Sequence, residues 1–257
     1  MEKAPDVDPI RSNRKAWNSD SRAYQEKHGG LLMEKPLAWG IWRTPESELG
    51  LLDDYAGKSI LELGCGAAQW SIALAREGAD PVGLDISEEQ LAHALRLAEA
   101  EGPRVPLVQA SGHMTPFRDS AFDIVLSDYG ATNFLDPYLW VPETARVLKP
   151  GGLLVFCSNS PLMLVCLDLE KDVMTETLQR PYFGMRLLED DSQFFDYQLP
   201  HGEWIDLFRA NGFAIERLVE TQPGEDARST FEDDWPLSWT RRWPAENIWK
   251  LRKEGET

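Results

Sequence analysis

The chain has 257 residues, enough to bury a full hydrophobic core in one large domain. Its apolar fraction of 42% and charged fraction of 27% are those of an ordinary soluble globular protein. The 26 basic and 43 acidic residues give a formal net charge of −17, and the basic residues are scattered along the chain. Such a chain repels phosphate backbones and anionic membrane surfaces, so we expect a small-molecule partner and no binding to nucleic acid or membrane.

The three cysteines, Cys65, Cys157 and Cys166, have neither an even count nor the spacing of metal ligands. We expect reduced thiols in a cytoplasmic protein without a metal site. The first residues are polar and acidic, and no apolar run approaches the length of a membrane span, so we expect neither a signal peptide nor a membrane segment. The composition leaves open whether the protein is a monomer or a homodimer.

Residues 1–57 are predicted to form a tail and a helical lid ahead of the main domain. Residues 1–10 are polar and contain two prolines, which indicates a loose tail. A helix is predicted over residues 12–27, with Trp17 and Tyr24 seven residues apart on one face. Two glycines shortly after this segment are predicted to end the helix.

A second helix is predicted to begin with Thr44 as its N-cap and to run to about residue 55. Strands and helices then alternate, which indicates a parallel sheet with helices on both faces. The predicted strands cover residues 59–63, 81–84, 105–108, 122–127 and 153–157, and the predicted helices cover residues 67–77 and 87–100 and lie within residues 136–148.

The alternation stops after the fifth strand, and residues 160–200 are interpreted as an insertion packed over the sheet. A helix over residues 202–210 and strands over 213–219 and 247–251 complete the pattern. The sequence therefore predicts an α/β fold: a Rossmann-like, doubly wound, mostly parallel seven-stranded sheet in a domain that covers residues 58–257.

A glycine turn follows the first strand of the sheet. The turn is Gly64-Cys65-Gly66, and about twenty residues later Asp85 ends the next strand. A glycine turn beside such an acid is typical of α/β sheets that hold an adenosine-type cofactor. The third glycine of a dinucleotide motif is replaced by Gln69, and Glu62, two residues before the turn, would repel a pyrophosphate. The Glu62 carboxylate could instead accept hydrogen bonds from the ammonium group of S-adenosylmethionine.

Four segments occur in the order Glu62-Leu63-Gly64-Cys65-Gly66, Leu84-Asp85, Phe122-Asp123-Ile124-Val125 and Arg146-Val147-Leu148-Lys149-Pro150-Gly151-Gly152. In this order and spacing they resemble the class I S-adenosylmethionine-dependent methyltransferases, in particular the subgroup that modifies small molecules. The resemblance covers about residues 59–157, and the order of elements continues beyond it.

The resemblance implies a role for each matching position. Glu62 and the backbone of the glycine turn would hold the amino acid end of S-adenosylmethionine. Asp85 would accept both ribose hydroxyls, as a carboxylate can, and Ile86 would pack on the adenine. The acid that often receives the adenine amino group in this family is replaced here by Ser111. The expected cofactor-binding residues are Tyr24, Glu62, Gly64, Cys65, Gly66, Asp85, Ile86, Ser111, Gly112, His113 and Ser127.

Methyl transfer from a sulfonium is an in-line displacement, which needs a base only when the acceptor must lose a proton. His201, at the start of the helix after the insertion, is the candidate for such a catalytic base, and no other catalytic residue is identified. The many aromatic residues before and after the sheet favour a flat or apolar acceptor.

The expected reaction transfers a methyl group to O, N or C of a small molecule and releases S-adenosylhomocysteine. Two alternatives stay open, an NAD(P)-dependent oxidoreductase and a non-catalytic S-adenosylmethionine-binding protein.

Overall fold

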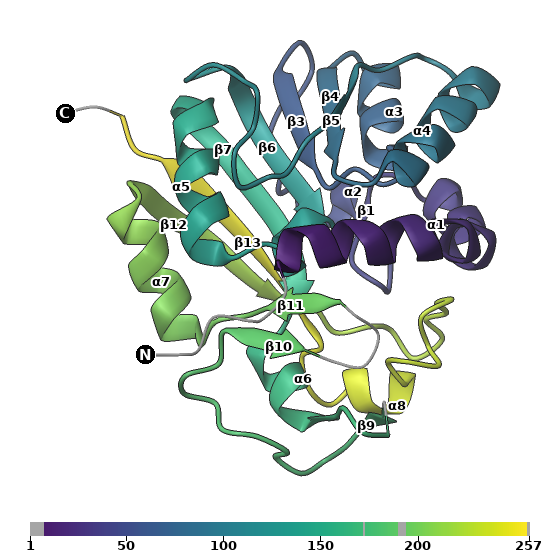
Figure 1. Cartoon of the computed structure of the whole chain (residues 1–257), viewed down its shortest axis with the longest axis vertical. Coiled ribbons are helices and arrows are strands. Elements are labelled where there is room, and N and C mark those ends of the chain that lie inside the picture. The colour runs from purple at the N-terminus through teal and green to yellow at the C-terminus, as the bar shows by residue number, and fades with distance from the viewer. Residues whose placement is uncertain (1–7, 172, 190–193, 256–257) are drawn as a thin grey trace.

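The computed structural model describes residues 8–171, 173–189 and 194–255. Its centre is a seven-stranded sheet in the order β12-β13-β7-β6-β3-β4-β5 (Figure 1). The pairs from β7 to β5 are parallel, whereas β13 runs antiparallel to both β7 and β12. This confirms the predicted Rossmann-like, mostly parallel sheet. The strands are β3 Ser59–Leu63, β4 Asp80–Asp85, β5 Leu107–Gln109, β6 Phe122–Asp128, β7 Leu148–Asn159, β12 Phe213–Glu220 and β13 Glu246–Lys253.

Four helices flank this sheet: α3 Gln69–Arg76, α4 Glu88–Glu101, α5 Pro137–Val147 and α7 His201–Ala210. Neighbouring strand residues face opposite sides, as the period of two in a strand requires. Leu61 packs in one cluster with Trp140 of α5 and Trp204 of α7. Ile60, the preceding residue, packs in a second cluster with Trp70 of α3. Helices therefore cover both faces, and only the strand ends are left to build a site.

The N-terminal helix α1, Pro9–Glu34, lies across the carboxyl ends of the strands (Figure 1). Asn13 fastens it there, because its side-chain amide donates 3.0 Å hydrogen bonds to the backbone oxygens of Phe134 and Phe195. Arg14 adds an ion pair to Glu88 of α4, with 3.0 Å between Nε and Oε2. The helix thus covers the sheet edge at which parallel α/β folds bind their ligands.

The predicted start of the first helix was three residues late. Asp8 caps α1 by accepting a 3.0 Å hydrogen bond from the backbone of Ile10, and Pro9 occupies the first helical position. Residues 9 and 10 are therefore helical and do not belong to a loose tail, while residues 1–7 of the predicted tail lie outside the described part of the chain.

The predicted end of this helix was also wrong, because α1 continues through Gly29 and Gly30 to Glu34. A glycine in a helix costs about 1 kcal/mol relative to alanine. The contacts of His28 oppose this cost: its ring stacks on Phe231 with 3.9 Å between centroids, and Nδ1 lies 2.7 Å from the hydroxyl of Thr230. The tertiary packing of His28 therefore outweighs the tendency of the two glycines to end the helix.

The predicted helix from Thr44 to about residue 55 is much shorter in the structure, where α2 covers only Glu46–Leu49. The preceding residues pair instead as two short strands, β1 Ala38–Trp39 and β2 Thr44–Pro45. The Glu46 carboxylate is buried and accepts hydrogen bonds from Trp39 Nε1 at 2.6 Å and from the backbone of Leu52 at 2.7 Å. The chain after α2 folds back onto this carboxylate, so the helix cannot continue.

The insertion after β7 and the C-terminal helix α8 form a layer beyond the carboxyl ends of the strands (Figure 1). This layer has its own apolar cluster, which includes Met163, Leu164 and Trp239. None of the helices in the described ranges is long and apolar enough to cross a membrane. The elements of the layer are α6 Pro161–Cys166, β8 Leu167–Asp168, β9 Val173–Met174, β10 Leu187–Glu189, β11 Phe195–Tyr197 and α8 Leu237–Thr240.

Candidate functional site

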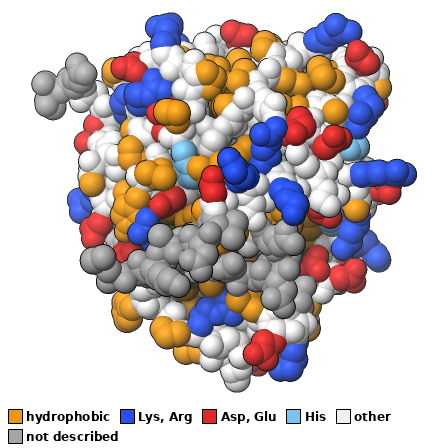
Figure 2. Space-filling view, in the orientation of Figure 1, with side chains coloured by type: hydrophobic (Ala, Val, Ile, Leu, Met, Phe, Trp, Pro, Cys, Tyr) orange, Lys and Arg blue, Asp and Glu red, His pale blue; other side chains and the backbone are white. Residues whose placement is uncertain are grey.

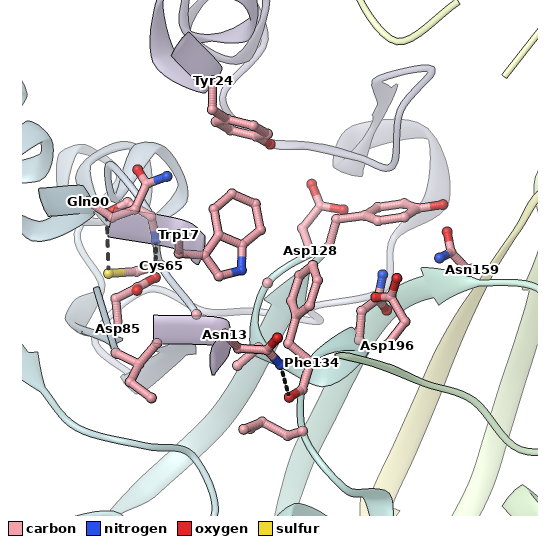
Figure 3. A pocket seen from close by; sticks show the side chains of 18 of the residues that line it. Asn13, Trp17, Tyr24, Cys65, Asp85, Gln90, Asp128, Phe134, Asn159 and Asp196 are labelled. Carbon is pink, nitrogen blue, oxygen red and sulfur yellow. Dashed lines mark hydrogen bonds between the residues drawn. The ribbon is translucent and has the colours of Figure 1, made fainter. Parts of the chain in front are cut away.

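A cavity of about 390 Å³ is lined by residues of α1 and by residues at the carboxyl ends of the parallel strands. Figure 3 shows Cys65 and Asp85 on one side of it and Asp128 and Asn159 on the other, with Trp17 between them. The cavity therefore has two ends, which we call the glycine-turn end (around Cys65 and Asp85) and the far end (around Asp128 and Asn159).

The glycine turn connects β3 to α3 in a conformation that its sequence dictates. Gly64 and Gly66 have φ of 77° and 53°, in the left-handed region that favours glycine. A Cβ on Gly64 would lie 2.0 Å from the backbone nitrogen of Ala131, so no side chain fits there. The amides of Gly64 and Cys65 both donate to the backbone oxygen of Leu84, at 2.8 and 2.9 Å, which fixes the turn beside the end of β4.

Asp85 is the last residue of β4 and is buried at the glycine-turn end. Its carboxylate accepts hydrogen bonds of 2.8 Å from the backbone amides of Gly66 and Ser87. Burial raises the pKa of Asp85 above its ordinary value, and these two hydrogen bonds act in the opposite direction. A carboxylate has about four lone-pair sites, so Asp85 keeps capacity for further hydroxyl donors.

Glu62 lies on β3 beneath the turn, is 5% exposed and also lines the cavity. Its Oε2 accepts hydrogen bonds from the backbone amide of Ser71, at 2.9 Å, and from the Ser71 hydroxyl, at 2.5 Å. Burial raises the pKa of Glu62 to about 8, and the neighbouring charges of Asp85 and Asp128 add to this effect. A cationic group at this position would favour the ionised carboxylate.

Arg43 and Asp128 form a buried ion pair at the far end, with 2.9 Å between Nη1 and Oδ2 and side chains only 3% and 6% exposed. Asp128 also accepts hydrogen bonds from the backbone of Gly40 at 2.8 Å and from Trp70 Nε1 at 3.2 Å. Arg43 in turn donates from Nη2 to the backbone oxygen of Lys35, at 2.7 Å. The pair therefore ties the end of α1 to the end of β6 and uses both oxygens of Asp128.

Aromatic rings cover the cavity from the side of α1 and the C-terminal segment. Trp17 makes edge contacts with Tyr24 and Phe134, with 5.4 and 5.2 Å between ring centroids. Phe231 and Trp235 add a further aromatic pair 6.1 Å apart. All five residues line the cavity, so much of its wall is apolar and suited to a flat ligand.

The structure brings most of the predicted cofactor-binding residues into this one cavity. They come from α1, from the glycine turn and from the segments after β4 and β5, which lie far apart in the sequence. The predicted residues that line the cavity are Tyr24, Glu62, Gly64, Cys65, Gly66, Asp85, Ile86, Ser111 and Gly112.

Three predicted residues are not among those that line the cavity. Ser127 is fully buried and donates from its hydroxyl to the backbone oxygen of Leu63, at 2.7 Å. His113 accepts a hydrogen bond at Nε2 from the backbone of Asp136, at 3.0 Å. His201 starts α7, where its Nε2 lies 2.6 Å from the side-chain nitrogen of Asn247.

Asn13, Arg43 and Asn159 line the cavity but do not stand out in the sequence. The ion-pair partner of Arg43, Asp128, is 85 positions away in the chain, so no local pattern indicates this pair. Asn159 ends the fifth parallel strand, and its place at that strand end was the one available indication. Within the described ranges, no group of three or more His, Cys, Asp or Glu side chains is arranged to hold a metal ion.

Part of the chain is similar in sequence to known proteins. Residues 61–156 match the family model described as "Methyltransferase domain". A demethylmenaquinone methyltransferase of Clavibacter sepedonicus is 40% identical over 127 residues, which cover 49% of this chain and 51% of the relative. The chain thus spans about half the length of this curated relative.

Two solved structures match over nearly the whole of both chains and show a shared fold. One is the Burkholderia thailandensis 1,6-didemethyltoxoflavin-N1-methyltransferase with bound 1,6-didemethyltoxoflavin and S-adenosylhomocysteine, at 14% identity and a TM-score of 0.61, covering 98% of this chain and 93% of that one. The other is the [4+2]-cyclase SpnF, at 18% identity and a TM-score of 0.65, covering all of both chains.

Proposed function

We propose that the chain is a class I S-adenosylmethionine-dependent methyltransferase, which transfers a methyl group from S-adenosylmethionine to O, N or C of a small molecule; the match of residues 61–156 to a methyltransferase domain supports this. The observation that carries the proposal is the pair of buried carboxylates, Glu62 and Asp85, on either side of the glycine turn. When bound, S-adenosylmethionine supplies a methyl group on a positively charged sulfur.

The residues at the glycine-turn end suit this cofactor better than a dinucleotide. Glu62 would accept hydrogen bonds from its ammonium group and Asp85 from its ribose hydroxyls. Arg43 is the one basic side chain among the described residues that line the cavity, and Asp128 already neutralises it. A pyrophosphate would therefore meet two carboxylates and no available cation, which argues against the oxidoreductase alternative.

Catalysis would rest on alignment and on exclusion of water. No histidine or lysine is found among the described residues that line the cavity, so His201 would need a rearrangement to act as a base. The roof made by α1, with Trp17 and Tyr24, would shield the reacting groups from solvent. An acceptor atom that is already nucleophilic, held in line with the methyl group, needs no further catalyst.

The acceptor is expected to be flat or apolar, in keeping with the aromatic wall. The curated relative acts on demethylmenaquinone and one fold neighbour on 1,6-didemethyltoxoflavin, both small molecules. On the face seen in Figure 2, Lys and Arg side chains are interspersed with Asp and Glu, with no continuous basic patch for nucleic acid. All three cysteines are buried and unpaired, as expected for a cytoplasmic protein.

Calorimetry with S-adenosylhomocysteine and, separately, with NADH and NADPH tests the cofactor. We expect the protein to bind S-adenosylhomocysteine and neither NADH nor NADPH. A protein that binds a nicotinamide cofactor and does not bind S-adenosylhomocysteine would refute the proposal. Incubation with labelled S-adenosylmethionine and a metabolite extract then tests the reaction. A protein that only binds the cofactor would release no S-adenosylhomocysteine above the blank.

A further inference from the structure

Asn159 presents an unusual polar group at the far end of the cavity. It is the last residue of β7, lines the cavity and is only 9% exposed. Its Oδ1 is enclosed and has no hydrogen-bond partner among the described residues. Buried polar atoms in folded proteins nearly always have a partner, so an exception at a cavity wall indicates a ligand that supplies it.

The side-chain amide of Asn159 is one of the polar groups of the cavity lining with unused hydrogen-bonding capacity, and Asn133 Oδ1 is another. The backbone oxygen of Asn159 already accepts a hydrogen bond from the side-chain amide of Gln198, so only the side chain is available. Asp128, on the same side of the cavity in Figure 3, uses both oxygens in the ion pair with Arg43 and in the bonds from Gly40 and Trp70.

Apolar side chains make up much of the wall at the far end, although the carboxylates of Asp128 and Asp196 lie on the same side of the cavity (Figure 3). Met163 and Leu164 belong to α6, which begins two residues after Asn159, and both line the cavity. Tyr129 and Trp235 line it as well, with 6.5 Å between their ring centroids. A largely apolar pocket with few unsatisfied polar groups selects ligands by hydrogen bonding, since a ligand without a matching group leaves the amide unpaired.

We propose that Asn159 determines acceptor specificity by hydrogen bonding to a polar substituent of the acceptor ring. The inference rests on the proposed function and narrows its acceptor to an uncharged aromatic or quinone-like ring that carries a hydroxyl or NH group. A carboxamide offers one donor end and one acceptor end, which a hydroxyl or an NH group can satisfy. An anionic substituent would find no unpaired cation among the described lining residues, because Arg43 is bound to Asp128.

Equilibrium dialysis with a matched pair of probes tests this inference. 1-Naphthol and 1-methylnaphthalene have nearly the same shape, but only the first has a hydroxyl group. With and without saturating S-adenosylhomocysteine, we expect the wild-type protein to bind 1-naphthol roughly tenfold more tightly, the effect of one hydrogen bond. Equal binding of the two probes by the wild-type protein would overturn the inference without any variant.

Asn159→Leu removes the amide at nearly constant volume and should abolish the preference while leaving S-adenosylhomocysteine affinity unchanged. Asn247→Leu is the matched control: Asn247 is also buried and also has an Oδ1 without a partner, but it lies outside the cavity lining. Retention of the tenfold preference in Asn159→Leu would overturn the inference. Failure of the wild-type protein to bind S-adenosylhomocysteine would instead refute the proposed function, and the probe preference measured without it would still test Asn159.

Discussion

The titration of Glu62 gives the sharpest test of the proposed cofactor site. Burial raises the pKa of this carboxyl group to about 8, and binding of an ammonium group would require the ionised form. Affinity should therefore fall as pH falls below 8, because protons compete with the ligand for the carboxylate. With half of the sites ionised at pH 8 and about 3% at pH 6.5, S-adenosylhomocysteine should bind roughly fifteenfold more weakly at pH 6.5.

Isothermal titration calorimetry at pH 6.5, 7.0, 7.5 and 8.0 measures this dependence, and buffers of different ionisation enthalpy show whether binding releases a proton. Glu62→Gln should bind more weakly at pH 8 and show no slope, so that the wild-type and variant affinities converge at pH 6.5. Glu246→Gln is the control, because Glu246 is another buried acid, with its pKa raised to about 7, that does not line the cavity. A wild-type affinity that is flat between pH 6.5 and 8, or an unchanged slope in Glu62→Gln, would refute the reasoning.

Three further changes test the structure around the site. Arg43→Met leaves Asp128 buried without its cation and should lower the free energy of unfolding by about 3 kcal/mol, measured in urea; a loss below about 1 kcal/mol would contradict the buried pair. Because the folded pKa of Glu246, about 7, exceeds the unfolded value of 4.5, its stabilising contribution is full below pH 4.5 and is lost as pH rises to 7. The free energy of unfolding of Glu246→Gln, relative to that of the wild-type protein, should therefore rise by about 3 kcal/mol between pH 4.5 and 8. Parallel curves of unfolding free energy against pH for the two proteins would contradict this. Asp85→Ala should weaken S-adenosylhomocysteine binding by about 2 kcal/mol or more in calorimetry, and an unchanged affinity would remove Asp85 from the site.

Local sequence patterns predicted the sheet well because a short run of apolar residues marks a strand without reference to the rest of the chain. The strands at residues 59–63 and 122–127 are short apolar runs, and the structure has them within one residue as β3 and β6. The helix stops were less reliable. Gly29 and Gly30 do not end α1, because His28 packs on Phe231, a residue about 200 positions away that no local pattern includes.

The candidate site likewise has one part that local sequence patterns predicted and one part that they did not. The glycine turn, with Glu62 before it and Asp85 after it, was visible in the sequence, because each acid has a fixed distance from a strand end and parallel strands bring these ends together. The sequence by itself thus determined the fold class, and it predicted that the glycine-turn end of the cavity would receive the cofactor.

Only the tertiary structure decided the far end of the cavity. Arg43 and Asp128 meet because the segment after α1 folds across the end of β6. Asn159 becomes part of a largely apolar cavity wall only because α6 and the C-terminal segment contribute residues to the same cavity. These contacts join residues far apart in the chain, and their energies depend on burial, which no single segment of sequence fixes.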